Sequence, residues 1–190
     1  TDWIETLILG HAGPYTYDQW VNHEVNFSDP AIKDAFDSLG TILLNPDFVN
    51  AGIGDVESIT TTSLSDVARA MGSGTCAITQ QAASFDGLLT DPESGNTTVG
   101  PGLGVWAFLT PPAVAGGNAV TGGGEFVAAF SNDTDTVKVQ QYLSSPEWAN
   151  SRVSLGGVAS ANNGLDSAKA SSPILQESVR ILQDPRTTFR

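Results

Sequence analysis

Apolar side chains recur at helical spacing in the first third of the chain. One series comprises Trp3, Leu7, Ile8 and Ala12, and a second comprises Ile32, Phe36, Leu39 and Leu43. Such spacing puts the side chains of each series on one face of a helix. Asp29-Pro30 supplies an N-cap with proline at the first helical position, and Asn45-Pro46 stops the second helix. The pattern therefore predicts two helices before residue 46.

The middle of the chain mixes loops with one helix and two short strands. Residues 50–61 are rich in Gly, Thr and Ser and are typical of a loop, whereas Ser63 precedes a helical apolar series that ends at Met71. The apolar, β-branched or aromatic runs Thr75–Gln80 and Val105–Thr110 predict strands.

Helical patterns return in the last third. The expected helices are Thr136–Leu143, Ser145–Leu155, Leu165–Ala170 and Pro173–Gln183. Asp184-Pro185 stops the last of them. We therefore expect an α/β domain that is dominated by helix and has a small number of strands.

A glycine run precedes these helices. Gly122, Gly123 and Gly124 lead into the apolar run Glu125–Phe130, for which we predict a short buried strand, and then into the acidic helix start at 131–135. Without a Cβ atom, glycine lets a ligand approach the main chain closely, although a plain turn would use the same residues. The run is a candidate ligand contact.

This order of glycine pair, short strand, helix and Ser145-Pro146-Glu147 resembles the family 1 extracellular solute-binding proteins, the sugar receptors of ABC importers. Three further segments carry the resemblance in the family's order: Thr1–Glu5 with Tyr17–Asn22, Asp29–Phe36, and Met71–Ile78 with Gln80-Gln81 and Ser84-Phe85. Together they cover most of the chain. The opening segment is similar to the α-glucoside-type, maltose-binding-protein-like branch.

The resemblance implies a fold and a chain organisation. The chain would be a single fragment dominated by the second, C-terminal lobe of a type II periplasmic-binding-protein-like fold. Residues 1–73 and 118–190 would form the ligand-binding lobe, and residues 74–117 would cross to a first lobe. Since strands at 75–81 and 105–110 would lack their first-lobe partners, we expect them to pair with each other or with a second copy, or to pack on the helices.

The resemblance also implies a site and a role. Sugars present an apolar face and a rim of hydroxyl groups, which aromatic rings and polar groups recognise. The residues expected to bind the carbohydrate are Asp2, Trp3, Gln81, Phe85, Gly122 and Gly123. The protein would be periplasmic or lipid-anchored at the cell surface and would deliver its sugar to a membrane permease without catalysis, cofactor or metal.

Composition narrows the alternatives. The net charge of −13, from 8 basic and 21 acidic side chains, opposes binding to nucleic acid or anionic lipid. The sequence lacks Gly-x-Ser-x-Gly, and its two histidines lack a partner at metal-binding spacing. The lone Cys76 is expected to be a small buried apolar residue, and pairing with a cysteine outside the sequence stays open. Two other hypotheses remain: a secreted carbohydrate-active hydrolase using paired carboxylates, and a structural or adhesive module.

Overall fold

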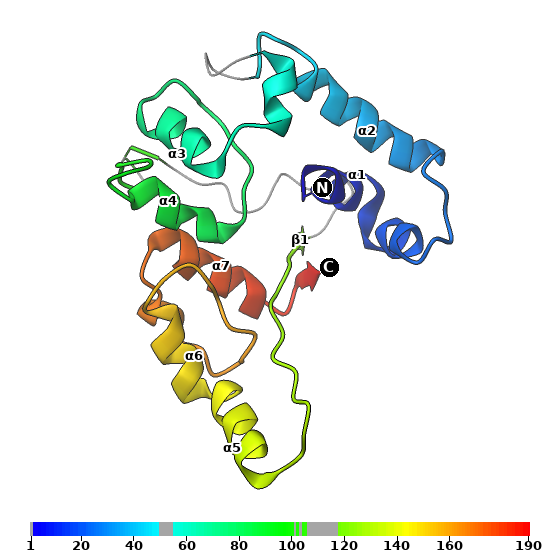
Figure 1. Ribbon diagram of the computed structural model, residues 1–190. Helices are drawn as coiled ribbons and strands as arrows, with labels where there is room; N and C mark the ends of the chain where they lie inside the picture. The colour runs from blue at the N-terminus through cyan, green and yellow to red at the C-terminus, as the bar shows by residue number, and fades with distance from the viewer. Residues whose placement is uncertain (1, 50–54, 101, 103, 106–117) are drawn as a thin grey trace.

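The computed structural model describes residues 2–49, 55–100, 102, 104–105 and 118–190. Helices dominate this part of the chain (Figure 1): α1 Asp2–Val21, α2 Pro30–Leu43, α3 Leu64–Gly72, α4 Asp86–Thr90, α5 Thr134–Leu143, α6 Pro146–Val153 and α7 Pro173–Gln183. Short 3-10 turns occur at Val56–Thr60, Ala83–Phe85 and Ser167–Lys169. The strands β1, Asn118–Val120, and β2, Thr187–Phe189, pair in parallel. The predicted helix-rich character with few strands is confirmed.

Side-chain caps explain where most of the predicted helices begin. The Asp29 carboxylate accepts a hydrogen bond from Ala31 N at 2.9 Å before α2. The hydroxyl oxygens of Ser63, Ser145 and Ser172 each accept a hydrogen bond of 3.1 Å from a backbone N–H group in the first turn of the helix that follows, which is α3, α6 and α7 respectively. These bonds satisfy N–H groups that have no partner within the helix.

Helix α1 consists of two helical pieces joined at a kink. Gly13 has φ 79° and ψ 168°, and Pro14 follows it. A positive φ suits glycine, and proline cannot continue the hydrogen-bond ladder of the preceding turn. The kink turns the second piece, with Tyr17 and Trp20, back toward α2 and the first piece, and Ile8, Tyr17 and Ile32 are buried together there.

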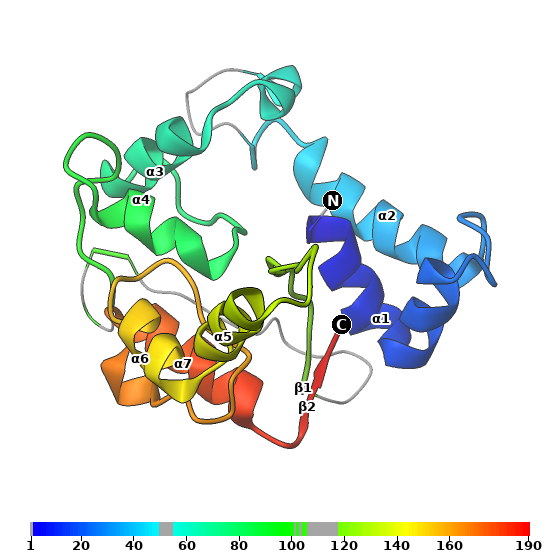
Figure 2. The same cartoon turned by 60° about the horizontal axis from the view of Figure 1, so that its bottom comes forward.

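Two other apolar clusters lie beneath the remaining helices. One joins α3 and α4 to α7 and contains Ala68, Phe85, Leu89, Val99, Val105 and Ile174. The other joins α6 and α7 and contains Ala149, Val153, Leu165, Ala170, Leu175 and Val179. Helix α7 contributes to both clusters, so it connects the middle of the chain to its C-terminal third (Figures 1 and 2).

The C-terminal strand ties the ends of the chain together. Gly122 N donates to Arg190 O at 2.8 Å, and Arg190 N donates to Val120 O at 3.0 Å. The Arg190 guanidinium donates to both carboxylate oxygens of Asp18 on α1, at 2.6 and 3.0 Å. The C-terminus therefore lies beside α1, as both ribbon views show (Figures 1 and 2).

Several predicted elements differ from the structure. Thr75–Gln80 and Glu125–Phe130 are irregular, so the prediction of strands there is wrong. Within Leu165–Ala170 the structure has only the 3-10 turn Ser167–Lys169. Of Val105–Thr110, all but Val105 lies outside the described residues, and Val105 forms an isolated bridge with Val99. Sequence patterns missed α4, β1 and β2.

The missing strand at 75–80 has a local cause. Thr75 N and Cys76 N both donate to Ala70 O at 3.0 Å, so the chain folds back on the end of α3 instead of extending beside a partner. The Cys76 side chain is only partly buried, against the expectation of a core position. Residues 75–80 therefore offer no unpaired strand edge, and self-association of the chain stays a prediction.

Candidate functional site

Three segments that the sequence singles out meet at Thr6 on α1. The Thr6 Oγ1 atom lies 3.0 Å from Thr121 Oγ1, and Gln80 Nε2 donates to Thr6 Oγ1 at 2.8 Å. Gln80 Nε2 also lies 3.4 Å from the backbone oxygen of Asp2. We call Thr6, Gln80 and Thr121 the threonine hub. It joins residues separated by 74 and 115 positions in the sequence.

The hub lies next to four of the six predicted ligand contacts. Asp2 and Trp3 occupy the first turn of α1; Asp2 is exposed and Trp3 is partly buried. Gln81 follows Gln80 and is exposed, and Gly122 follows Thr121. The structure thus brings these four residues to one region, through hydrogen bonds made by their neighbours. Whether they contact a ligand stays a prediction.

The two glycines have different surroundings. A Cβ atom on Gly122 would lie 2.2 Å from Phe189 Cε2, so the Phe189 ring packs against the bare backbone there. A Cβ atom on Gly123 would meet nothing within 4 Å. The close approach at Gly122 is therefore made by the chain itself, whereas Gly123 leaves backbone open to another molecule.

Phe85 lies apart from the hub. Its side chain is 7% exposed and belongs to the cluster that joins α3 and α4 to α7. Beside it Asp86, also 7% exposed, accepts a hydrogen bond from the Ser172 hydroxyl at the start of α7. These contacts place Phe85 in the packing of the domain, and its predicted stacking on a sugar is untested.

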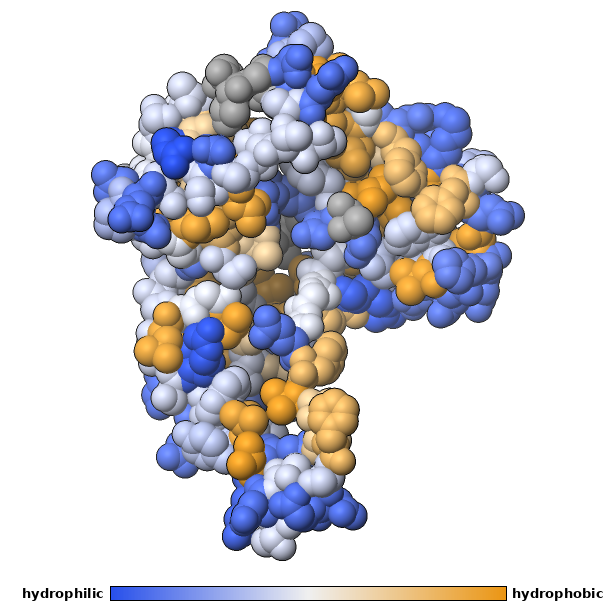
Figure 3. All heavy atoms as spheres, in the orientation of Figure 1, coloured by the Kyte–Doolittle hydropathy of each residue, from blue (hydrophilic) through white to orange (hydrophobic). Residues whose placement is uncertain are grey.

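An extended apolar segment leaves the hub. Phe126 is 94% exposed, Val127 67% and Phe130 100%, in the stretch that runs from β1 to α5. Figure 3 shows apolar atoms on the narrow projection that this stretch forms with α5. The predicted buried strand is therefore an exposed, irregular apolar segment.

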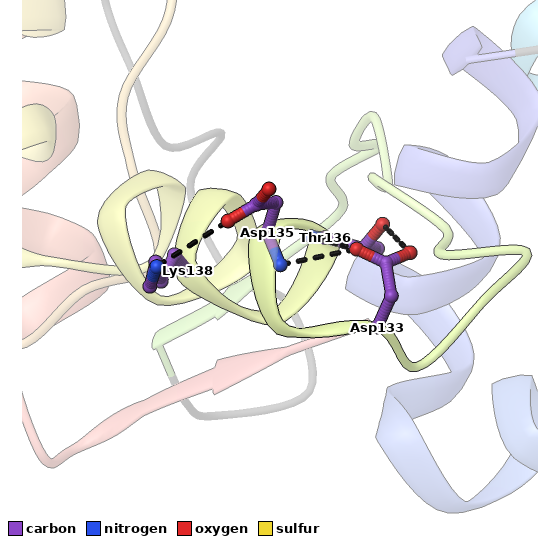
Figure 4. A network of polar contacts seen from close by, with 4 residues as sticks. All are labelled: Asp133, Asp135, Thr136 and Lys138. Carbon is purple, nitrogen blue, oxygen red and sulfur yellow. Dashed lines mark hydrogen bonds and ion pairs between the residues drawn. The ribbon is translucent and has the colours of Figure 1, made fainter.

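Beyond that segment, a polar network begins α5 (Figure 4). Asp133 Oδ1 accepts hydrogen bonds from Asp135 N and Thr136 N, both at 3.0 Å, and Oδ2 accepts from Thr136 Oγ1 at 2.8 Å. Hydrogen bonds from the Ser131 hydroxyl and from Thr136 hold the pKa of Asp133 well below its usual range. Lys138 Nζ lies 3.3 Å from Asp135 Oδ1. The predicted acidic helix start is confirmed as an N-cap.

Sequence reasoning missed the hub residues themselves. Gln80 stands beside the predicted Gln81, and Thr121 beside Gly122, so the correct segments were identified but the connecting side chains were not. Thr6 has no distinguishing signal, since a single threonine within an apolar helix is common. Among the described residues, no helix is apolar and long enough to cross a membrane, and no group of three His, Cys, Asp or Glu side chains could hold a metal ion.

Comparison with known proteins gives two local matches. The chain is 42% identical over 52 residues to the osmoprotective compounds-binding protein GgtB of Synechocystis sp., a match that covers 27% of this chain. It is 40% identical over 58 residues to the alpha-glucosides-binding periplasmic protein AglE of Rhizobium meliloti, which covers 30%. No family model matches, and no solved structure matches.

These matches span 12% and 13% of the lengths of the two relatives. Both relatives are named as binding proteins, and one is named as periplasmic. Over between a quarter and a third of its length, therefore, this chain is similar to two proteins named for binding solutes, one for osmoprotective compounds and the other for α-glucosides.

Proposed function

We propose that this chain belongs to an extracytoplasmic solute-binding component of an ABC importer and that its solute is a carbohydrate. The observation that carries the proposal is the threonine hub, which brings the segments of Asp2-Trp3, Gln81 and Gly122-Gly123 together. The local similarity to two solute-binding proteins supports the same role. The α-glucoside-type branch is our specific assignment.

The chemistry around the hub suits a sugar. The surrounding groups are hydroxyl, amide, carboxylate, bare glycine backbone and one indole ring, which can contact both the hydroxyl rim and the apolar face of a pyranose. With a net charge of −13 the protein disfavours anionic solutes. A neutral mono- or oligosaccharide is the class that fits best.

We further propose that the chain supplies the second lobe of a two-lobed type II fold. In this proposal residues 1–73 and 118–190 form the lobe, residues 74–117 pass toward a first lobe, and the sugar lies between the lobes as they close. The partner is then the membrane permease, and a lipid anchor or periplasmic location follows from the role. Gly123 and the exposed segment 124–130 would face the first lobe.

A screen of sugars against the full-length protein tests the proposal. We expect one or a few neutral sugars to raise the thermal unfolding temperature in a concentration-dependent way, because a ligand that binds only the native state stabilises it. Product analysis by chromatography should show that the sugar is unchanged. A cleaved sugar would favour the hydrolase hypothesis, and no stabilisation by any sugar would favour a structural module.

Two substitutions locate the site within the full-length protein. Gly123→Val should abolish sugar binding by steric exclusion without unfolding the protein, because nothing lies within 4 Å of the added Cβ position. Gly87→Val is the matched control, since that glycine on α4 has equally open surroundings. Trp3→Ala should also weaken binding, while Trp148→Ala should lower stability, because Trp148 is partly buried on α6. Normal sugar uptake by the Gly123→Val protein would contradict the site.

A further inference from the structure

The kink in α1 directs two aromatic rings back toward the first turns of the same helix. Tyr17 and Trp20 are three residues apart on the second piece, so they share a face. The Tyr17 hydroxyl donates to Glu5 Oε2 at 3.2 Å, across the kink. His23, with φ 61°, then turns the chain so that Phe27 reaches Trp20.

These residues line a hollow of about 320 Å³ that is open to solvent. Its lining side chains are Glu5, Tyr17, Trp20, Val21, His23 and Phe27. The Tyr17 and Trp20 ring centroids lie 5.8 Å apart at 60°, and those of Trp20 and Phe27 lie 5.6 Å apart at 82°. Rings at these distances and angles are in edge-to-face contact with one another, and part of each ring also borders the hollow. The volume is at the lower end of the range for small-molecule sites.

The charge at the hollow is negative and unbalanced. None of the ion pairs between described residues includes Glu5, and the Arg190 guanidinium is paired with Asp18. Burial, and then the nearby Glu5 charge, raise the pKa of Tyr17, so its phenol stays neutral and keeps its proton. Among the lining side chains, Glu5 is the only carboxylate, and there is no Lys or Arg.

The lining offers few hydrogen-bond donors. The Tyr17 proton is directed at Glu5, and Trp20 Nε1 is buried without a partner among the described residues, so it does not reach the hollow. Only the His23 ring remains as a donor, whereas sugar hydroxyls call for several donors and acceptors. Aromatic faces beside an unpaired carboxylate match a different ligand, since such faces attract alkylated ammonium groups.

We propose that this hollow binds a small organic cation of the quaternary ammonium class. The methylated nitrogen packs against Tyr17, Trp20 and Phe27 and is paired electrostatically with Glu5. The site is distinct from the threonine hub and does not depend on carbohydrate binding, because Thr6 and Glu5 project from α1 about 100° apart.

A pair of isosteres tests the proposal on the protein without sugar. Choline and its neutral carbon analogue, 3,3-dimethylbutan-1-ol, have nearly the same shape. In ¹H–¹⁵N NMR titrations at constant ionic strength, choline should shift the Trp20 indole signal saturably and bind at least about fivefold more tightly than the alcohol. Equal affinities, or no saturable shift with choline, would overturn the proposal.

Three substitutions distinguish the contributions of the Glu5 charge, the Phe27 ring and the overall net charge to choline binding. Glu5→Gln keeps the acceptor for Tyr17 and should weaken choline binding by about fivefold or more. Phe27→Leu keeps an apolar side chain but loses the ring face, and should weaken it about two- to fivefold. Glu147→Gln on α6 removes the same charge far from the hollow and should leave binding unchanged.

Circular dichroism and thermal melting establish that each variant is folded. Phe27 is 61% exposed, so Phe27→Leu should fold even if Glu5→Gln does not. A folded Phe27→Leu protein with unchanged choline affinity would contradict a cage of aromatic rings. Equal losses in Glu5→Gln and Glu147→Gln would show that only net charge matters and would also overturn the proposal.

Discussion

Two neighbouring regions of this chain both carry apolar runs and have opposite structures. Residues 134–183 form α5, α6 and α7 and bury Val153, Leu175 and Val179 almost completely. Residues 121–130, shortly before them, contain the apolar run 126–130 but leave Phe126 and Phe130 94% and 100% exposed. The predicted helices α5, α6 and α7 of the first region are confirmed, although Leu165–Ala170 between them has only a 3-10 turn, whereas the strand predicted in the second region is absent.

The difference follows from where each kind of element finds its hydrogen bonds. A helix satisfies its backbone within the segment, and a serine or aspartate at its start supplies the rest, so α6 and α7 are determined locally. A strand needs a partner that the local sequence does not specify. Among the described residues only β1 with β2, and the bridge of Val99 with Val105, have one.

The largest expected effect contrasts a buried leucine with an exposed phenylalanine. Leu175 is 1% exposed between α6 and α7, so Leu175→Ala should lower the free energy of unfolding by about 2–5 kcal/mol. Phe130→Ala should change it by less than about 0.5 kcal/mol, because the ring is fully exposed. Urea unfolding followed by circular dichroism measures both. A large loss in Phe130→Ala would mean that residues 121–130 are packed and that the contrast is false.

A smaller contrast lies inside the extended region. Gly122→Ala must displace the Phe189 ring, whose Cε2 atom is 2.2 Å from the new Cβ position, and should cost about 1–2 kcal/mol because that ring is half-exposed and can move. Gly123→Ala meets nothing and should be nearly neutral. Comparing the two urea midpoints checks the expectation. Equal stability of the two variants would show that the contact between Gly122 and Phe189 does not constrain the segment.

How far the sequence predicts this molecule depends on the range of the interactions involved. The bounds of α7 and the caps Asp29, Ser63 and Ser145 follow from adjacent residues. The pairing of β1 with β2 joins Asn118 to Thr187, and no pattern within either segment specifies that partner.

The candidate site likewise has a part that the sequence predicts and a part that only the tertiary fold determines. The segments around Asp2, Gln81 and Gly122 could be selected from the residue types and the family resemblance. The hydrogen bonds that bring them together involve Thr6, Gln80 and Thr121, whose roles depend on the tertiary fold.

A cap substitution tests the claim that the helical region is determined locally. Ser145 Oγ accepts a hydrogen bond from Trp148 N at 3.1 Å, so Ser145→Ala should cost about 1 kcal/mol of unfolding free energy. Ser151→Ala, at an exposed position within α6, is the control and should be neutral or slightly stabilising. Urea unfolding again gives the comparison. If Ser145→Ala is as stable as Ser151→Ala, packing rather than capping determines where α6 begins.

The smallest effect concerns the junction of the two regions, where Asp133 caps α5 (Figure 4). Because its folded-state pKa lies below the usual 3.8, the ionised cap stabilises the native state above that pH, and this contribution disappears as the pH falls through the folded-state pKa. Asp133→Asn keeps a good capping residue that does not titrate. Urea midpoints should therefore fall more steeply for the wild type than for Asp133→Asn between about pH 4 and pH 2, with the curves parallel above about pH 5. Asp184→Asn is the matched comparison, because hydrogen bonds from Arg186 lower the pKa of Asp184 to about 2. Replacing the Asp184 carboxylate should likewise make the urea midpoint fall less steeply as the pH decreases. Identical slopes for the wild type and Asp133→Asn would mean that the cap is not formed in solution and that α5 shares the irregularity of the segment before it.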